Sequence, residues 1–148
     1  MARYNCAHQT AAGSTLSLLM LVNPGTAVRA ALYSLTLGSD ATPADLAGEF
    51  TVQRGTVSGT GTALTENTRD TLTVAATIAC EGGTFTGSTV TANTYQKMIP
   101  LNQRATYEWN ANPGDEIYGR AVADDVIVVY SVAHGGTPNM NVSVAWWE

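Results

Sequence analysis

Hydrophobic and polar residues alternate along most of this chain, and short turn motifs interrupt the alternation. In one clear example, Phe50 and Val52 alternate with Glu49, Thr51 and Gln53. Successive side chains of a β-strand point to opposite faces of the sheet. This stretch therefore predicts a strand with one face in the core and the other in solvent.

Similar runs recur between turns that are rich in Gly, Pro and Asn. The motifs "NPG", "NPGD" and "HGGTPN" predict tight turns. The predicted strands include residues 16–22, 27–39, 48–55, 71–80, 95–101, 126–132 and 140–146. No segment has the pattern of a capped amphipathic helix longer than a turn or two. The chain is therefore predicted to be all-β, with eight or nine short strands in two packed antiparallel sheets.

Composition and charge narrow the range of possible functions. The chain has 148 residues, the size of one domain, with 45% hydrophobic and 13% charged residues. Its net charge is −5, and its basic residues are few and scattered, with Lys97 as the single lysine. Nucleic-acid binding depends on clustered Lys and Arg that neutralise phosphates, so we predict no nucleic-acid partner. The apolar run at 16–22 is too short to cross a bilayer and follows a polar stretch, so we predict a soluble protein with no membrane partner.

The glycine-rich stretch at residues 55–67, "GTVSGTGTALTEN", raises the question of a phosphate-binding loop. Such a loop needs a Lys on the phosphates, a Ser or Thr on magnesium and a following helix. No Lys follows Gly61, and the surrounding pattern is that of strands. We interpret the stretch as a connection between two strands.

No arrangement of side chains predicts catalysis or metal binding. Cys6 and His8 could form a dyad, but a spacing of two fits one face of a terminal strand better. The remaining candidates are Cys80 and His134 as metal ligands, and the acidic pairs Asp115–Glu116 and Asp124–Asp125 as calcium ligands or a hydrolytic pair. The spacing does not bring these groups together. We predict no enzyme activity, no metal and no cofactor, and two free or buried cysteines.

Two regions are candidates for contact with another protein. Trp146 and Trp147 are adjacent, so in a strand one fills the core and the other, assigned to Trp147, is free to anchor an interface. Residues 1–14 are polar and rich in small side chains, and they precede the first strong strand. We predict an arm or edge segment there, followed by one domain over residues 15–148. The predicted interface residues are Arg3, Tyr4, His8 and Trp147.

Several segments of the chain resemble a known class of proteins. The segments are "MARYNCAHQTAAGSTLSLLML", "VRAALYSLTLGS" followed by "ATPAD" and "FTVQR", and "LNQRATYEWNANPGDE". In pattern and order they resemble the small single jelly-roll head proteins of tailed bacteriophages, which decorate or cement an assembled capsid. The likeness covers most of the chain, although none of these strings is a diagnostic motif.

This resemblance implies a jelly roll of about eight strands that forms a homotrimer. It implies a protein made in the host cytoplasm that binds the major capsid protein on the outer surface of the virion. Two other functions stay open from the residues alone. One is a trimeric receptor-binding head of a tail fibre; the other is a carbohydrate-binding β-sandwich, for which Tyr107 and Trp109 on one face are the only indication.

Overall fold

The structure, a computed structural model, describes residues 2–12, 17–40, 42–56, 61–70, 75–82, 94–122 and 125–148. Within these ranges the chain forms twelve strands and no helix, and so no helix that could span a membrane. The strands are β1 (Arg3–Ala11), β2 (Ser17–Asn23), β3 (Ala30–Ser39), β4 (Ala47–Thr56), β5 (Thr62–Ala63), β6 (Asn67–Thr68), β7 (Ala79–Gly82), β8 (Thr94–Asn102), β9 (Thr106–Asn110), β10 (Ile117–Gly119), β11 (Asp125–His134) and β12 (Asn139–Trp147).

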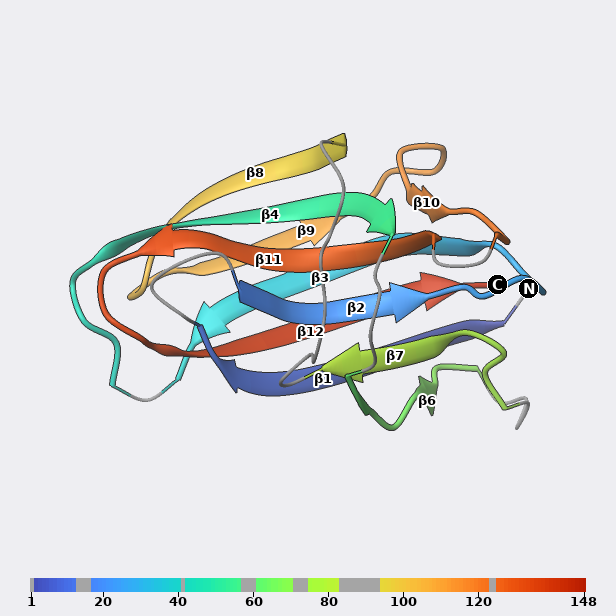
Figure 1. Cartoon of the computed structure of the whole chain (residues 1–148), viewed down its shortest axis with the longest axis horizontal. Helices are drawn as coiled ribbons and strands as arrows, with labels where there is room; N and C mark the ends of the chain where they lie inside the picture. Colours follow the sequence, from blue (N-terminus) through green and yellow to red (C-terminus); the bar gives the residue numbers. More distant parts are fainter. Residues whose placement is uncertain are drawn as a thin grey trace.

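These strands form two antiparallel sheets that pack face to face (Figure 1). Sheet A has the order β10-β3-β12-β1-β6, with β9 also paired to β3. Sheet B has the order β5-β7-β2-β11-β4-β8. The predicted all-β sandwich is therefore confirmed.

Most consecutive long strands lie in opposite sheets. The first four, β1 to β4, lie in sheets A, B, A and B in turn, and β11 is followed by β12 across the sandwich. The two ends of the chain meet, because the backbones of Ala2 and Glu148 exchange two hydrogen bonds of 3.1 Å. Both termini therefore lie at the same end of the molecule (Figure 1).

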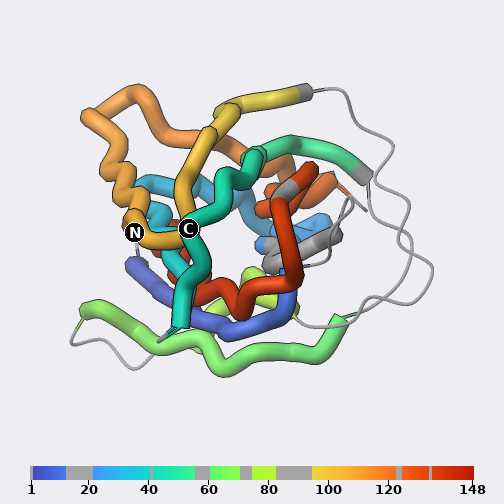
Figure 2. The backbone as a smooth tube through the Cα atoms, turned by 90° about the vertical axis from the view of Figure 1, so that its left-hand side faces the viewer, coloured from blue at the N-terminus to red at the C-terminus, as the bar shows by residue number. Residues whose placement is uncertain are grey.

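The core lies between the sheets and is filled by the inward-facing side chains of both. Seen from one end of the molecule, the backbone of the two sheets surrounds this region (Figure 2). Trp146 is 0% exposed and stacks on Tyr4, with ring centroids 6.0 Å apart. Met140, Val142 and Val144 continue the inward row of β12, as their alternation predicts. At one end of the sandwich, the carboxylate of Asp125 forms ion pairs with two arginines, which are described below.

Two local predictions differ from the structure. Of the strand predicted at 71–80, residues 71–74 lie outside the described ranges, residues 75–78 are not in a strand, and residues 79 and 80 belong to β7. In β3, simple alternation predicts Leu32 on one face and Leu35 on the other. A β-bulge opposite Trp146 shifts the register at Tyr33, so both leucines face the core.

Residues 1–14 contain β1, which pairs with β12 along the whole length from Arg3 to Ala11. On its other side, the two-residue strand β6 pairs only with Tyr4 and Asn5. The described part of the predicted arm or edge segment is thus a strand near the edge of this chain's own sheet A. Residues 13 and 14 lie outside the described ranges.

The outer face of sheet B is buried along β4 and β11, although Tyr95 and Met98 of the edge strand β8 are exposed. In β4, Thr51 and Gln53 are 0% and 4% exposed, and they pair with Tyr130 and Val128 of β11, which are also buried. The prediction that the polar face of β4 lies in solvent is therefore wrong. The Gln53 side chain donates a buried hydrogen bond of 2.9 Å to the hydroxyl of Thr51, so these polar groups have partners without water.

Candidate functional site

The outer face of sheet A is open to solvent and carries small, mostly uncharged side chains. A shallow hollow of about 480 Å³ lies on this face. Its lining includes Ala7, Gln9, Thr36, Thr106, Asn141 and Ser143, from strands β1, β3, β9 and β12. Because most of these side chains are short, the hollow is shallow, and the described residues that line it do not form a set of groups arranged for catalysis.

At the terminal end of this face, one row of side chains crosses four strands. Tyr118 of β10 pairs with Ala31 of β3, Ala31 pairs with Trp147 of β12, and Trp147 pairs with Arg3 of β1. Tyr118 and Trp147 meet edge to face, with ring centroids 5.9 Å apart and an interplanar angle of 82°. Ala31 lies between them in the row and is 0% exposed. A small residue at this position lets the two rings approach each other.

Three further residues complete what we call the aromatic–arginine cluster. Arg29 places its guanidinium carbon 5.0 Å from the centre of the Tyr118 ring. Arg69 donates a hydrogen bond of 3.4 Å to the hydroxyl of Tyr33. The cluster is Arg3, Arg29, Tyr33, Arg69, Tyr118 and Trp147.

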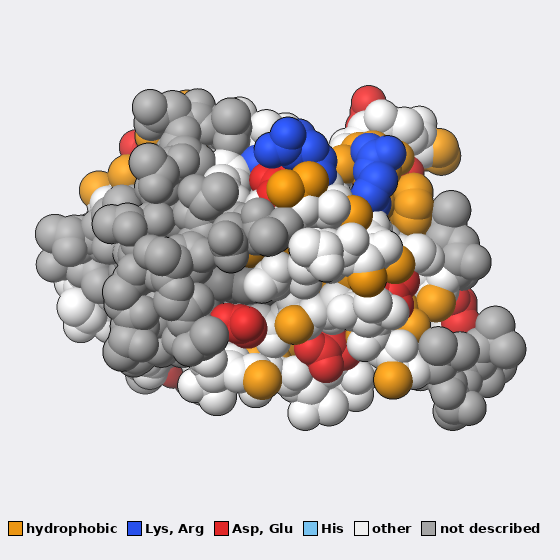
Figure 3. All heavy atoms as spheres, turned by 45° about the vertical axis from the view of Figure 1, so that its right-hand side comes forward, with side chains coloured by type: hydrophobic (Ala, Val, Ile, Leu, Met, Phe, Trp, Pro, Cys, Tyr) orange, Lys and Arg blue, Asp and Glu red, His pale blue; other side chains and the backbone are white. Residues whose placement is uncertain are grey.

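The charge of this cluster contrasts with that of the whole chain. It holds three of the seven basic residues in a protein whose net charge is −5. Among the described residues, none of its three arginines forms an ion pair. On the face seen in Figure 3, which lies on another side of the molecule, a few basic side chains lie beside both hydrophobic and acidic ones.

A smaller hollow of about 230 Å³ lies within the cluster. Arg3, Tyr33 and Trp147 line it, together with Pro113 and Glu116 of the turn before β10. Glu116 accepts hydrogen bonds from the Gly114 amide, at 2.9 Å, and from the Tyr118 hydroxyl, at 3.2 Å. Partial burial and the Glu116 carboxylate raise the pKa of Tyr118, so its hydroxyl stays protonated and keeps this contact.

The "NPGD" turn explains how Tyr118 reaches this position. Gly114 has a φ of 96°, a left-handed conformation that glycine adopts without strain, and the Asp115 amide donates to the Asn112 carbonyl. The turn directs β10 back against β3, which places Tyr118 beside Ala31. The sequence predicted this turn correctly.

The four predicted interface residues separate into two pairs. Arg3 and Trp147 are neighbours on the outer face and both line the smaller hollow. Tyr4 and His8 instead face inward. Tyr4 is 1% exposed and stacks in the core, where burial and then the nearby Glu148 raise its pKa. We therefore keep only Arg3 and Trp147 as contact candidates.

His8 packs its ring against the backbone of Gly82 in β7. Its Nε2 is buried and has no hydrogen-bond partner within the described part of the chain. Burial lowers the pKa of His8, so the imidazole is neutral at pH 7. A neutral ring wedged between two strands belongs to the interior of the fold.

Arg29, Tyr33, Arg69 and Tyr118 belong to the cluster but were not predicted from the sequence. They come from three separate segments, and only strand pairing brings them together. The sequence does contain one signal, because Tyr118 follows a well-defined turn. Without the partner strand, this signal does not identify its neighbours.

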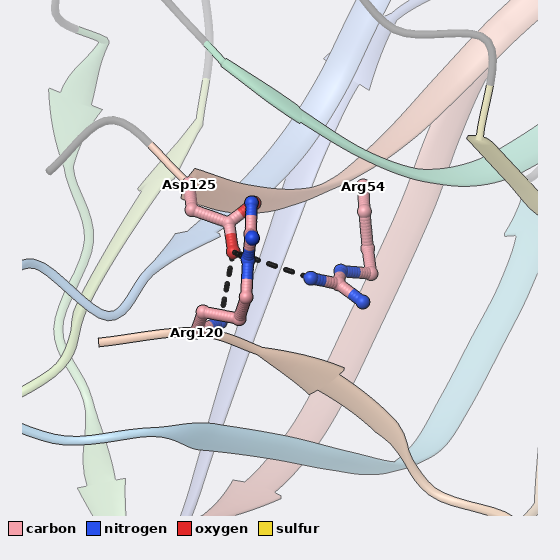
Figure 4. Close-up of polar contacts among 3 residues, drawn as sticks. All are labelled: Arg54, Arg120 and Asp125. Atoms are coloured by element: carbon pink, nitrogen blue, oxygen red, sulfur yellow. Dashed lines mark hydrogen bonds and ion pairs between the residues drawn. The ribbon is translucent and has the colours of Figure 1, made fainter. Parts of the chain in front are cut away.

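Asp125, one of the predicted acidic candidates, contacts two arginines and has a structural role (Figure 4). It is 5% exposed, and its Oδ2 accepts hydrogen bonds from Nε and the backbone amide of Arg120, at 2.8 Å and 3.0 Å. Arg54 approaches the same oxygen at 3.3 Å. Burial pulls the pKa of Asp125 upward, but these hydrogen bonds and positive charges outweigh burial and lower it. Asp124 lies outside the described residues.

The other chemical candidates do not converge within the part of the chain that is described. No group of three or more His, Cys, Asp or Glu side chains there could hold a metal ion. Tyr107 and Trp109 share a face, as predicted, but they pack against the core, and the Lys97 ammonium lies 4.2 Å from the Trp109 ring centre. They do not form an open platform for a sugar.

Comparison with known proteins adds no relative. No family model, no curated protein and no solved structure matches this chain. The functional argument therefore depends on the geometry of the chain itself.

Proposed function

We propose that this protein is a structural component of a tailed-phage virion, which binds the outside of the capsid and ties neighbouring major capsid subunits together. The protein is made in the host cytoplasm and acts by adding contact area across joints of the shell. It performs no chemistry. The observation that carries the proposal is the aromatic–arginine cluster on the outer face of sheet A.

The residue types of the cluster support a protein contact. Trp, Tyr and Arg are the residues most enriched among those that dominate binding energy at interfaces. Here Trp147 and Tyr118 are held by strands β12 and β10, each paired to the long strand β3. Side chains ordered before binding lose little conformational entropy when a partner arrives. Within the described residues the three guanidinium groups form no ion pair, and their positive charge favours an acidic partner surface.

The strand order supports the jelly-roll form of the sandwich. Sheet A contains β1, β12, β3 and β9, and sheet B contains β2, β11, β4 and β8, which makes eight principal strands. Each of these strands is followed along the chain by one in the opposite sheet, except β4, which is followed by its neighbour β8. We interpret this order as a jelly roll, the architecture that the resemblance implies.

The proposal includes assembly as a homotrimer. Each of the three copies makes only a modest contact with the capsid lattice. Because the three contacts form together, the trimer binds with much higher avidity than a single copy. The cluster lies beside both chain termini, so one end of each subunit is the contact end.

The first test is the native mass at several concentrations, followed by co-sedimentation with empty, expanded heads built from the major capsid protein of the same phage. We expect a trimer and saturable binding. Trp147→Ala should weaken binding by about 30-fold, as expected for the loss of a residue that contributes about 2 kcal/mol. The matched control is Tyr95→Ala, which removes an aromatic ring that is 53% exposed on the edge strand β8.

Three outcomes would count against this proposal. A monomer at every concentration that also fails to bind heads would remove the decoration function. Binding to host cells but not to heads would favour the receptor-binding alternative. Equal losses from Trp147→Ala and Tyr95→Ala would mean that the cluster is not the contact site.

A further inference from the structure

The two cysteines of the chain meet inside the sandwich. Cys6 lies in β1 of sheet A, and Cys80 lies in β7 of sheet B. Both are free thiols and both are 0% exposed. Each thiol shifts the pKa of the other, so the two side chains lie close together across the space between the sheets. Far apart in sequence, the two sulfur atoms are therefore neighbours in the fold.

The backbone around this thiol pair is tightly held. The amide of Cys80 donates a hydrogen bond of 2.8 Å to the Glu66 carboxylate, and its carbonyl accepts one of 2.9 Å from the Leu64 amide. Cys6 is paired with Val144 in the middle of the β1–β12 ladder. Neither cysteine can move away from the other without breaking these contacts.

Gly82 explains why the two strands come so close. His8 lies two residues after Cys6 in β1, and Gly82 lies two residues after Cys80 in β7. The His8 ring lies over Gly82. A Cβ at Gly82 would come within 2.6 Å of His8 Cδ2, closer than real contacts allow. The missing side chain thus lets β7 approach β1, and this approach keeps the two thiols in contact.

The interaction between the two thiols makes them chemically unequal. The neighbouring Cys80 side chain lowers the pKa of Cys6 against the opposing effect of burial. The neighbouring Cys6 side chain, together with burial, raises the pKa of Cys80. Cys6 is therefore the better nucleophile of the pair, because the thiolate is the reactive form of cysteine.

We propose that Cys6 and Cys80 are a cross-linking site, at which a peroxide joins sheet A to sheet B through a disulfide. In the first step the Cys6 thiolate attacks one oxygen of hydrogen peroxide, breaks the O–O bond and becomes a sulfenic acid, with hydroxide as the leaving group. In the second step the Cys80 sulfur attacks the Cys6 sulfur and water leaves. Two thiols and one peroxide thus give one disulfide and two waters.

The cross-link would close a long loop that contains β2, β3, β4, β5 and β6. Such a loop restricts the unfolded chain strongly, and the native strands already hold the two sulfur atoms together. Disulfides persist in oxidising surroundings outside the cell and not in the cytosol. The site depends only on the fold and is independent of the proposed capsid role.

The test uses the full chain, purified with reductant and then treated with hydrogen peroxide under native conditions. We expect the intact mass to fall by two hydrogen atoms and peptide mapping without reductant to join the Cys6 and Cys80 peptides. The melting temperature should rise by about 10 °C and return when reductant is added. Cys6→Ser and Cys80→Ser are the matched controls, and neither should gain stability with peroxide.

Three results would overturn the proposal. They are a gain of oxygen without loss of two hydrogens, a cross-link only between chains, and a reaction only after denaturation. If a serine variant fails to fold, alkylation of the wild-type protein still tests the proposal, because it reports which thiols are free. Both thiols should become unreactive together as peroxide is added, and loss of one thiol while the other still reacts would contradict a shared bond.

Discussion

The outer faces of the two sheets differ, although both are built from alternating strands. On sheet A the outward side chains of Gln9, Asn141 and Thr106 are exposed, and the face ends in the aromatic–arginine cluster. On sheet B the outward side chains of β4 and β11 are buried, with Val128 at 0% and Tyr130 at 4% exposure. The open face of sheet A is therefore available to a partner, while the buried part of the outer face of sheet B, on β4 and β11, contributes to stability in the same way as the core.

The largest expected difference comes from placing a charge on each face. Val128→Asp would bury a carboxylate with no positive partner and should cost about 3–5 kcal/mol of unfolding free energy. Ser143→Asp, in the hollow on sheet A, should change stability by less than about 0.5 kcal/mol. Denaturant unfolding measures both, and equal losses would remove the distinction between the faces.

Substitutions of the two adjacent tryptophans compare the core with the open face of sheet A. Trp146→Ala removes a fully buried ring and should cost about 3–4 kcal/mol. Trp147→Ala, on the outer face, should cost only about 1 kcal/mol, the value of one aromatic pair with Tyr118. Thermal and denaturant melts of the two variants provide the measurement. A larger loss from Trp147→Ala would place its main role in folding and weaken it as a contact residue.

Alkaline titration tests the buried face of sheet B. Burial raises the pKa of Tyr130 to about 12, whereas in the unfolded chain it titrates near 10. Between these values the unfolded state releases a proton that the native state keeps, so stability falls as the pH rises through this window. The loss should approach about 2 kcal/mol, and Tyr130→Phe should remove that part of the slope. An unchanged slope in the variant would show that Tyr130 is accessible to water.

The smallest expected effects come from two glycines. Gly82→Ala places a methyl group against the His8 ring between the sheets and should cost about 1–2 kcal/mol. Gly38→Ala, on the outer side of sheet A, meets only the Thr106 side chain at 3.3 Å, which can rotate away. Its cost should be a few tenths of a kcal/mol. The melting temperatures of the two variants measure both costs. If β7 were loosely packed on β1, the order of the two costs would be reversed.

The candidate site was only half predictable. Trp147 was correctly expected on the face opposite Trp146, because adjacent residues of a strand cannot share a face. Tyr4 and His8 were grouped with it because they lie in a polar terminal segment, yet alternation along β1 turns both inward. Arg29, Arg69 and Tyr118 join the cluster through pairings between strands distant in sequence, and no local pattern carries that information.

By itself, the sequence determined the all-β class, most strand positions, the tight turns and the inward row of β12. These features follow from local rules, namely alternation with a period of two and the backbone conformations that Gly, Pro and Asn allow. Only the tertiary structure decided which outer face is buried, which arginines meet Trp147, and that Cys6 touches Cys80. These depend on strand order, on a bulge that shifts the register in β3, and on how closely two sheets approach, which are set by packing across the whole chain.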